Sequence, residues 1–81
     1  LERLPQVLLN VPVARRQPLE DLPSVSRELA ATTASLDDRG RVLLRYSGTE
    51  PLARVMVEGE DAGEIETLAE RLAEAIRAEL G

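Results

Sequence analysis

The sequence predicts an α+β fold, a small and mainly antiparallel sheet that carries two helices on one of its faces. Apolar residues alternate with a period of two in three short segments and recur with a helical period in two longer ones. These segments follow in the order strand, helix, strand, strand, helix, and only short connections remain between them. Because 81 residues build one domain with a thin core, we expect one layer of sheet packed against one layer of helices.

The first strand is expected after a short leading segment. Residues 1–5 show no clear pattern, and we interpret them as the remnant of a linker, so that the domain itself covers residues 6–81. Apolar side chains then alternate from Val7 onward. They predict a strand that ends near Pro12, because proline cannot donate a hydrogen bond to a neighbouring strand.

The first helix is predicted from Leu22 to Leu36, where apolar residues recur at helical spacing. Pro23 fits the first turn because the N–H group that proline lacks would be unpaired there. Asp21 is the expected cap, since its carboxylate can accept a hydrogen bond from a free N–H group of that turn. The segment Asp37–Gly40 is rich in turn-forming residues and ends the helix.

The second and third strands are expected to form a hairpin. The apolar residues of the second strand are Val42, Leu44 and Tyr46. Because side chains of a strand alternate between its two faces, Arg45 and Ser47 point to the opposite face. The third strand covers residues 53–58. If it pairs with the second, Arg54 lies across from Arg45, and the two like charges repel unless an anion sits between them.

The last helix begins at Asp61, which forms a capping pattern with Glu64 three residues later. Its apolar residues form one stripe: Ile65, Leu68, Ala69, Leu72, Ile76 and Leu80. The remaining face is rich in carboxylates, which is typical of a helix face that is exposed to water. This helix therefore completes the layer that covers the sheet.

The composition excludes several kinds of site. The chain has no Cys and no His, which removes disulfides, thiol chemistry, histidine bases and the commonest zinc ligands. We expect no catalytic residue, no metal site and no cofactor within this domain. The net charge of −5 argues against nucleic acid as a partner, and no long apolar run indicates a membrane span. The cytoplasm is the default location.

The connection between the second and third strands carries the groups that proteins use to bind a phosphate dianion. It reads Ser47-Gly48-Thr49-Glu50-Pro51, with Arg45 before it and Arg54 after it. The two hydroxyl groups and the two guanidinium groups are donors to phosphate oxygens. Gly48 is expected to adopt a positive φ so that neighbouring N–H groups converge. We further expect residues 47–51 to be exposed and their donors to be free in the absence of a ligand.

The stretch from Gly40 to Asp61, which contains this loop, resembles the C-terminal domain of the α-D-phosphohexomutases. Within that family it is most similar to the bacterial enzymes that act on glucosamine phosphates. The element order is similar over the whole chain, and the specific match covers residues 40–61. The resemblance implies the last of four domains, a fold related to the TATA-binding-protein class, and a domain that closes over the substrate.

The resemblance also implies a role for the loop. The residues that would bind the phosphate that is not being transferred are Arg45, Ser47, Gly48, Thr49 and Arg54. Glu50 and Pro51 also match, but a carboxylate is no ligand for a dianion, and we assign both to the geometry of the loop. The complete enzyme would interconvert glucosamine 6-phosphate and glucosamine 1-phosphate, an intramolecular phosphate transfer that supplies cell-wall precursors.

The partners implied are the phosphosugar substrate and the other three domains of that enzyme. The phosphorylated serine, the magnesium ligands and the sugar-reading loop of the family belong to those domains. Magnesium is therefore expected in the full-length enzyme, and this domain alone should be inactive.

Four other interpretations remain open from the sequence. The chain could be the C-terminal domain of a phosphomannomutase or phosphoglucomutase, which share the family. A Ser-Gly-Thr turn can also be a plain hairpin loop with local hydroxyl bonds. The element order is similar to that of RNA-binding sheets, although these use exposed aromatic residues and Tyr46 is the only aromatic residue here. The acidic last helix could serve as an interaction surface.

Overall fold

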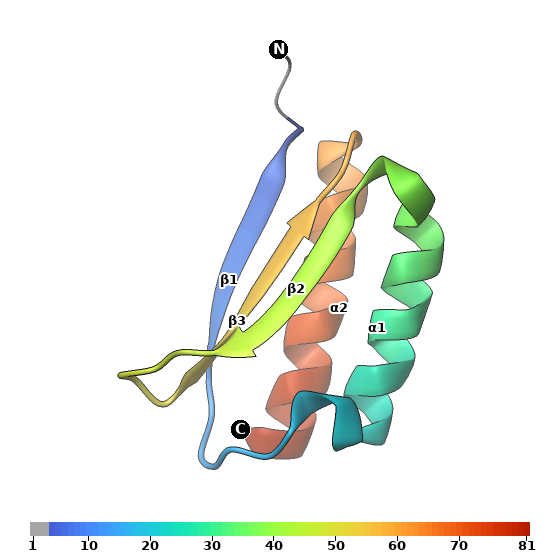
Figure 1. The fold of residues 1–81 in the computed structure, drawn as a ribbon. Helices are drawn as coiled ribbons and strands as arrows, with labels where there is room; N and C mark the ends of the chain where they lie inside the picture. The colour runs from blue at the N-terminus through green and yellow to red at the C-terminus, as the bar shows by residue number, and fades with distance from the viewer. Residues whose placement is uncertain (1–3) are drawn as a thin grey trace.

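Three strands and two long helices form two layers in a computed structural model, which describes residues 4–81 (Figure 1). The elements are β1 (Gln6–Pro12), α1 (Pro23–Leu36), β2 (Arg41–Tyr46), β3 (Leu52–Glu58) and α2 (Ala62–Leu80), with short 3₁₀ turns at Leu19–Asp21 and Asp37–Arg39. Both helices cover the same face of the sheet (Figure 1). The predicted α+β fold and its element order are confirmed.

The sheet places β3, the last strand in sequence, between the other two. The strand order is β1-β3-β2, and β3 is antiparallel to both neighbours. The edge strands β1 and β2 are therefore parallel to each other, and α1 makes the crossover between them. The expected hairpin of β2 and β3 is confirmed, with Arg45 directly opposite Arg54.

The core lies between the inner face of the sheet and the helices. Central strand β3 contributes Ala53, Val55 and Val57, all of which are fully buried. The predicted stripe of α2 is buried as well, namely Ile65, Leu68, Ala69, Leu72, Ile76 and Leu80. Burying each large aliphatic side chain stabilises the fold by about 1.5–3 kcal/mol. Val42, Leu44 and Tyr46 pack against the rim of this core, as their alternation predicts.

The two helices begin differently. In α2 the predicted cap is confirmed, since Asp61 Oδ1 accepts a hydrogen bond of 3.0 Å from the N–H of Glu64. In α1 the prediction of Asp21 as the cap is wrong. The cap position is Leu22, which makes no side-chain cap bond, and Asp21 lies in the preceding 3₁₀ turn. The reason is burial, because the turn places Leu22 in the core with 4% of its surface exposed.

The connection from α1 to β2 is the predicted turn. Asp37 has a φ of 54°, the one positive φ of a non-glycine residue within residues 4–81. Gly40 is the last residue before β2. A Cβ atom on Gly40 would overlap the carbonyl oxygen of Glu58. Of the predicted linker, residues 1–3 lie outside the described residues, and the carbonyl of Pro5 accepts a 3.2 Å hydrogen bond from the N–H of Gly59.

Candidate functional site

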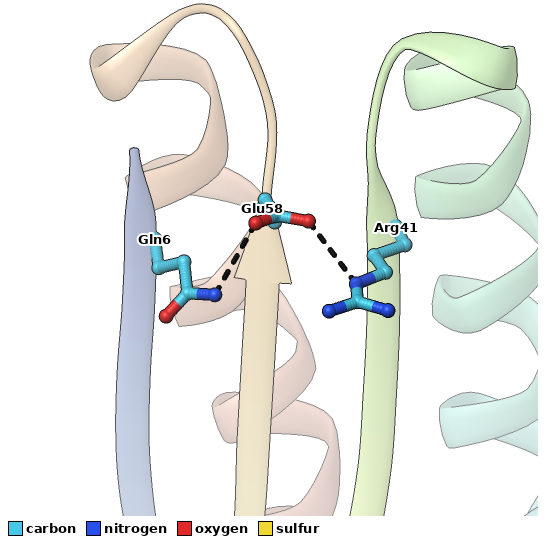
Figure 2. A network of polar contacts seen from close by, with 3 residues as sticks. All are labelled: Gln6, Arg41 and Glu58. Carbon is cyan, nitrogen blue, oxygen red and sulfur yellow. Dashed lines mark hydrogen bonds and ion pairs between the residues drawn. The ribbon is translucent and has the colours of Figure 1, made fainter. Parts of the chain in front are cut away.

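The outer face of the sheet, opposite the helices, carries three rows of side chains that span all three strands. The row at the start of β2 joins all three strands through one carboxylate, as Figure 2 shows. Glu58 Oε1 accepts from Arg41 Nε at 3.1 Å, and Glu58 Oε2 accepts from Gln6 Nε2 at 3.2 Å. The middle row is apolar and consists of Leu8, Met56 and Leu43. Leu8 and Leu43 are 69% and 45% exposed.

The third row lies next to the loop and, unlike the apolar middle row, carries two positive charges. Arg45 and Arg54 face each other across β2 and β3, and Asn10 is the partner of Arg54 on β1. Within residues 4–81 neither guanidinium makes a hydrogen bond or an ion pair. Two cations of the same face are therefore adjacent and have no carboxylate between them. Like charges directly opposite each other in a sheet are destabilising.

The loop after β2 is held by its own first residue. Ser47 N–H donates to the carbonyl of Leu52 at 2.9 Å, which closes the hairpin. Ser47 Oγ accepts from the N–H groups of Thr49 and Glu50 at 3.3 and 3.2 Å. The expectation that the whole loop is exposed is wrong for Ser47, which is only 5% exposed. The expectation of free donors is wrong for the N–H groups of Thr49 and Glu50, which donate to Ser47 Oγ. The hydroxyl acts as a local acceptor that shapes the turn, as serine commonly does.

The rest of the loop is exposed, and Gly48 has a different use from the one expected. No glycine within residues 4–81 has a positive φ, so that expectation for Gly48 is wrong. A Cβ atom on Gly48 would instead meet nothing within 4 Å. The missing side chain thus leaves open space at this point of the loop. The Thr49 hydroxyl makes no hydrogen bond within the described residues.

All five predicted site residues line one hollow of the outer face. Its volume is about 590 Å³, within the range of small-molecule sites. The lining residues are Arg45, Ser47, Gly48, Thr49 and Arg54, together with Tyr46 and the apolar side chains Leu8, Leu43 and Met56. A larger hollow of about 730 Å³ near the start of α2 is lined by three carboxylates, Glu60, Asp61 and Glu64, and by one cation, Arg39, so its net negative charge disfavours a dianion.

Sequence reasoning missed Arg16. It lies in the connection after β1, and one nitrogen of its guanidinium donates to the carbonyls of Ser47 and Glu50 at 3.0 and 2.7 Å. The same guanidinium lies over the Tyr46 ring, 5.8 Å from the ring centroid. The sequence alone assigns no role to the segment around Arg16. No signal in its spacing indicates a contact with a loop some thirty residues later.

The position of Tyr46 argues against the RNA-binding alternative. Its ring packs against the core, and its hydroxyl exchanges hydrogen bonds with the backbone of Gln17. It is therefore not free to stack on a base. Among residues 4–81, no helix is both long and apolar enough for a membrane span. The same residues contain no cluster of three carboxylates arranged to hold a metal ion.

Comparison with known proteins agrees with this geometry. The family model of the phosphoglucomutase/phosphomannomutase C-terminal domain matches residues 8–75. The chain is 53% identical over 78 residues to the phosphoglucosamine mutase of Syntrophotalea carbinolica, with 96% of this chain covered. It is 59% identical over 73 residues to that of Dechloromonas aromatica, with 90% covered. The chain spans only 17% and 16% of the lengths of these two relatives.

Solved structures give the same result. Aspergillus fumigatus N-acetylphosphoglucosamine mutase, in a complex of a variant with glucose 1,6-bisphosphate, matches 94% of this chain with a TM-score of 0.78 and 32% identity. The complex with GlcNAc-6P and magnesium matches 90% with a TM-score of 0.74 and 30% identity. In each case the match covers 16% of the fungal chain.

Fold and site thus define a class, a two-layer α+β domain with an exposed loop that is flanked by two arginines facing each other across β2 and β3. The chain belongs to the phosphoglucomutase/phosphomannomutase C-terminal domain family and is the C-terminal domain of an α-D-phosphohexomutase.

Proposed function

We propose that this domain binds the phosphate group of a phosphosugar within a phosphoglucosamine mutase. Arg45 and Arg54 supply the charge, Ser47 and Thr49 supply hydroxyl groups, and Gly48 leaves room for the phosphate. The observation that carries the proposal is the arginine pair, which has no carboxylate partner within residues 4–81 and lines the same hollow as the loop. Charge-assisted hydrogen bonds to such an anion are roughly twice as strong as neutral ones.

The proposed reaction of the parent protein is the interconversion of glucosamine 6-phosphate and glucosamine 1-phosphate. By the parent protein we mean the longer protein that carries this domain. The names of the relatives that are 53% and 59% identical support glucosamine phosphates over hexose phosphates. The phosphate that is bound here would be the one that is not being transferred. Its fixed position would convert binding energy into orientation of the reacting phosphate.

The chemistry of transfer lies outside this domain in our proposal. The described residues offer no nucleophile paired with a base, and their carboxylates do not fit a metal ion. The phosphorylated serine and the magnesium ion of the parent protein are assigned to its other three domains, which are the proposed partners together with the substrate. We place the reaction in the cytoplasm as part of the same proposal.

The test is an assay of the parent protein and of the 81-residue chain. We expect the parent protein to form glucosamine 1-phosphate from glucosamine 6-phosphate, and the chain alone to form none. Glucose 6-phosphate and mannose 6-phosphate are assayed beside it. Faster turnover of either hexose phosphate would favour the phosphoglucomutase or phosphomannomutase alternative. The absence of turnover with all three would contradict the proposal.

A further inference from the structure

The geometry points to Arg16 as a positioning residue that holds the phosphate loop in its binding shape. The inference rests on the function proposed above and adds a residue to it from a distant part of the sequence. Arg16 is absent from the residues that line the hollow, so its effect on a ligand would pass through the loop. Its contacts with the two ends of the loop and with Tyr46 carry the argument.

A loop that binds an anion must direct its carbonyl oxygens away from the ligand, because their partial negative charge repels it. Arg16 binds two of these oxygens, those of Ser47 and Glu50, through a single nitrogen at 3.0 and 2.7 Å. A third carbonyl, that of Pro51, accepts from the N–H of Val13 at 2.9 Å. The segment after β1 thus occupies the carbonyls at both ends of the loop.

Arg16 is itself held on both sides. On its C-terminal side, the N–H of Gln17 donates to the Tyr46 hydroxyl at 3.0 Å, and that hydroxyl donates back to the Gln17 carbonyl. On its N-terminal side, the N–H of Ala14 donates to the Leu80 carbonyl at 2.7 Å. The segment is therefore fixed to the end of β2 and to the end of α2. Because the backbone on both sides of Arg16 is fixed, its side chain can hold the exposed loop in one shape.

The neighbouring residue provides a matched control. Arg15 has the same charge and is also exposed, but its guanidinium donates to the carbonyl of Glu79 at 3.3 Å, at the end of α2. An effect of overall charge would be the same for both arginines. An effect on the loop would be specific to Arg16.

The experiment measures steady-state kinetics of the parent protein with glucosamine 6-phosphate for four variants. Arg16→Met keeps the length of the side chain and removes its charge and donors, and Arg16→Lys keeps a charged donor. Arg15→Ala is the control, and Arg45→Ala tests the site itself. Because loss of Arg16 leaves in place every group proposed to touch the phosphate and only loosens the loop that carries them, we expect Arg16→Met to weaken binding, raising KM about three- to thirtyfold and changing kcat less than about threefold.

Arg16→Lys should recover part of the increase in KM, and Arg15→Ala should match the unmodified protein. The inference is overturned if Arg16→Met leaves KM unchanged while Arg45→Ala raises it. It is also overturned if Arg15→Ala raises KM as much as Arg16→Met does. If Arg16→Met lowers kcat only in proportion to the amount of folded protein that is lost, and Arg16→Lys does not restore it, then Arg16 stabilises the fold and does not position the loop. If the unmodified parent protein has no activity, the proposed function fails and this inference fails with it.

Discussion

The two ends of the outer sheet face use the same residue types in opposite arrangements. At the start of β2, Arg41 faces Glu58 across the strands and binds its carboxylate at 3.1 Å. Four residues further along the same two strands, Arg45 faces Arg54, and neither has a partner within the described residues. Arg41 is thus paired with a carboxylate of the same chain. The second pair is left for an anion from outside.

The difference cannot be explained by stability. A partly exposed ion pair such as Arg41 with Glu58 contributes about 0.2–1 kcal/mol, and a pair of like charges across two strands costs a similar amount. Replacing one arginine of the second pair by an acid would therefore make the fold slightly more stable. A feature that opposes folding and lines an open hollow indicates a binding role.

The largest effect is expected from a substitution that gives the loop end of the outer face an Arg–Glu pair, like the pair at the start of β2. Arg54→Glu would place a carboxylate opposite Arg45, as Glu58 lies opposite Arg41. It removes a charge-assisted bond of about 1.5–3 kcal/mol and adds repulsion toward the phosphate, so kcat/KM of the parent protein should fall by on the order of a hundredfold or more.

The same variant should not be less stable. We expect the midpoint of urea unfolding of the parent protein to stay the same or rise slightly, because a repulsive pair becomes an attractive one. A variant that loses activity because it unfolds would contradict this interpretation. A variant that keeps full activity would exclude Arg54 from the site.

The two glycines that flank β2 give the next largest effect. A Cβ atom on Gly40 would overlap the backbone of Glu58, whereas on Gly48 it would meet nothing within 4 Å. Gly40→Ala should therefore lower the free energy of unfolding by about 1–3 kcal/mol. Gly48→Ala should change it by less than about 0.5 kcal/mol, and should raise KM by up to about tenfold, because the methyl group occupies space meant for the phosphate.

These two glycine variants are compared by denaturant unfolding and by kinetics of the parent protein. An equal loss of stability in both would mean that the loop is packed in a way that the structure does not show. A Gly48→Ala variant with an unchanged KM would mean that the phosphate does not approach the loop at this residue.

The smallest expected effect is at the Glu58 end. Glu58→Gln removes the charge that holds Arg41, and the free energy of unfolding should fall by about 0.2–1 kcal/mol. The loss should shrink at high salt, since screening weakens exposed ion pairs. We expect turnover by the parent protein to stay unchanged. A strong loss of turnover would mean that the substrate contacts both ends of the face.

Much of the fold could be predicted because local patterns determine it. The period of two in Val42, Leu44 and Tyr46 fixed which face of β2 is buried, and it thereby placed Arg45 on the outer face. The hairpin then brought Arg54 opposite Arg45 without further information. Asp61 could be identified as a cap because its partner Glu64 is only three residues away.

The errors arise where tertiary contacts decide. Asp21 has the side chain of a cap, but burial of Leu22 places it outside the cap position. Ser47 was expected to be exposed, and it is instead buried, with its hydroxyl oxygen accepting from two N–H groups of its own loop. Arg16 was missed because its partners are residues of a loop that only the folded chain brings near. No periodicity of the sequence can show such contacts.

The most direct test of the central claim compares Arg45→Ala with Arg41→Ala in the parent protein. Both arginines lie on β2, point to the same face and are four residues apart. We predict that Arg45→Ala lowers kcat/KM for glucosamine 6-phosphate by about tenfold to a few hundredfold, from loss of a bond of about 1.5–3 kcal/mol. Arg41→Ala should leave kcat/KM within about twofold. An equal loss in both variants, or a larger loss in Arg41→Ala, would contradict the claim that the loop end of this face binds the phosphate.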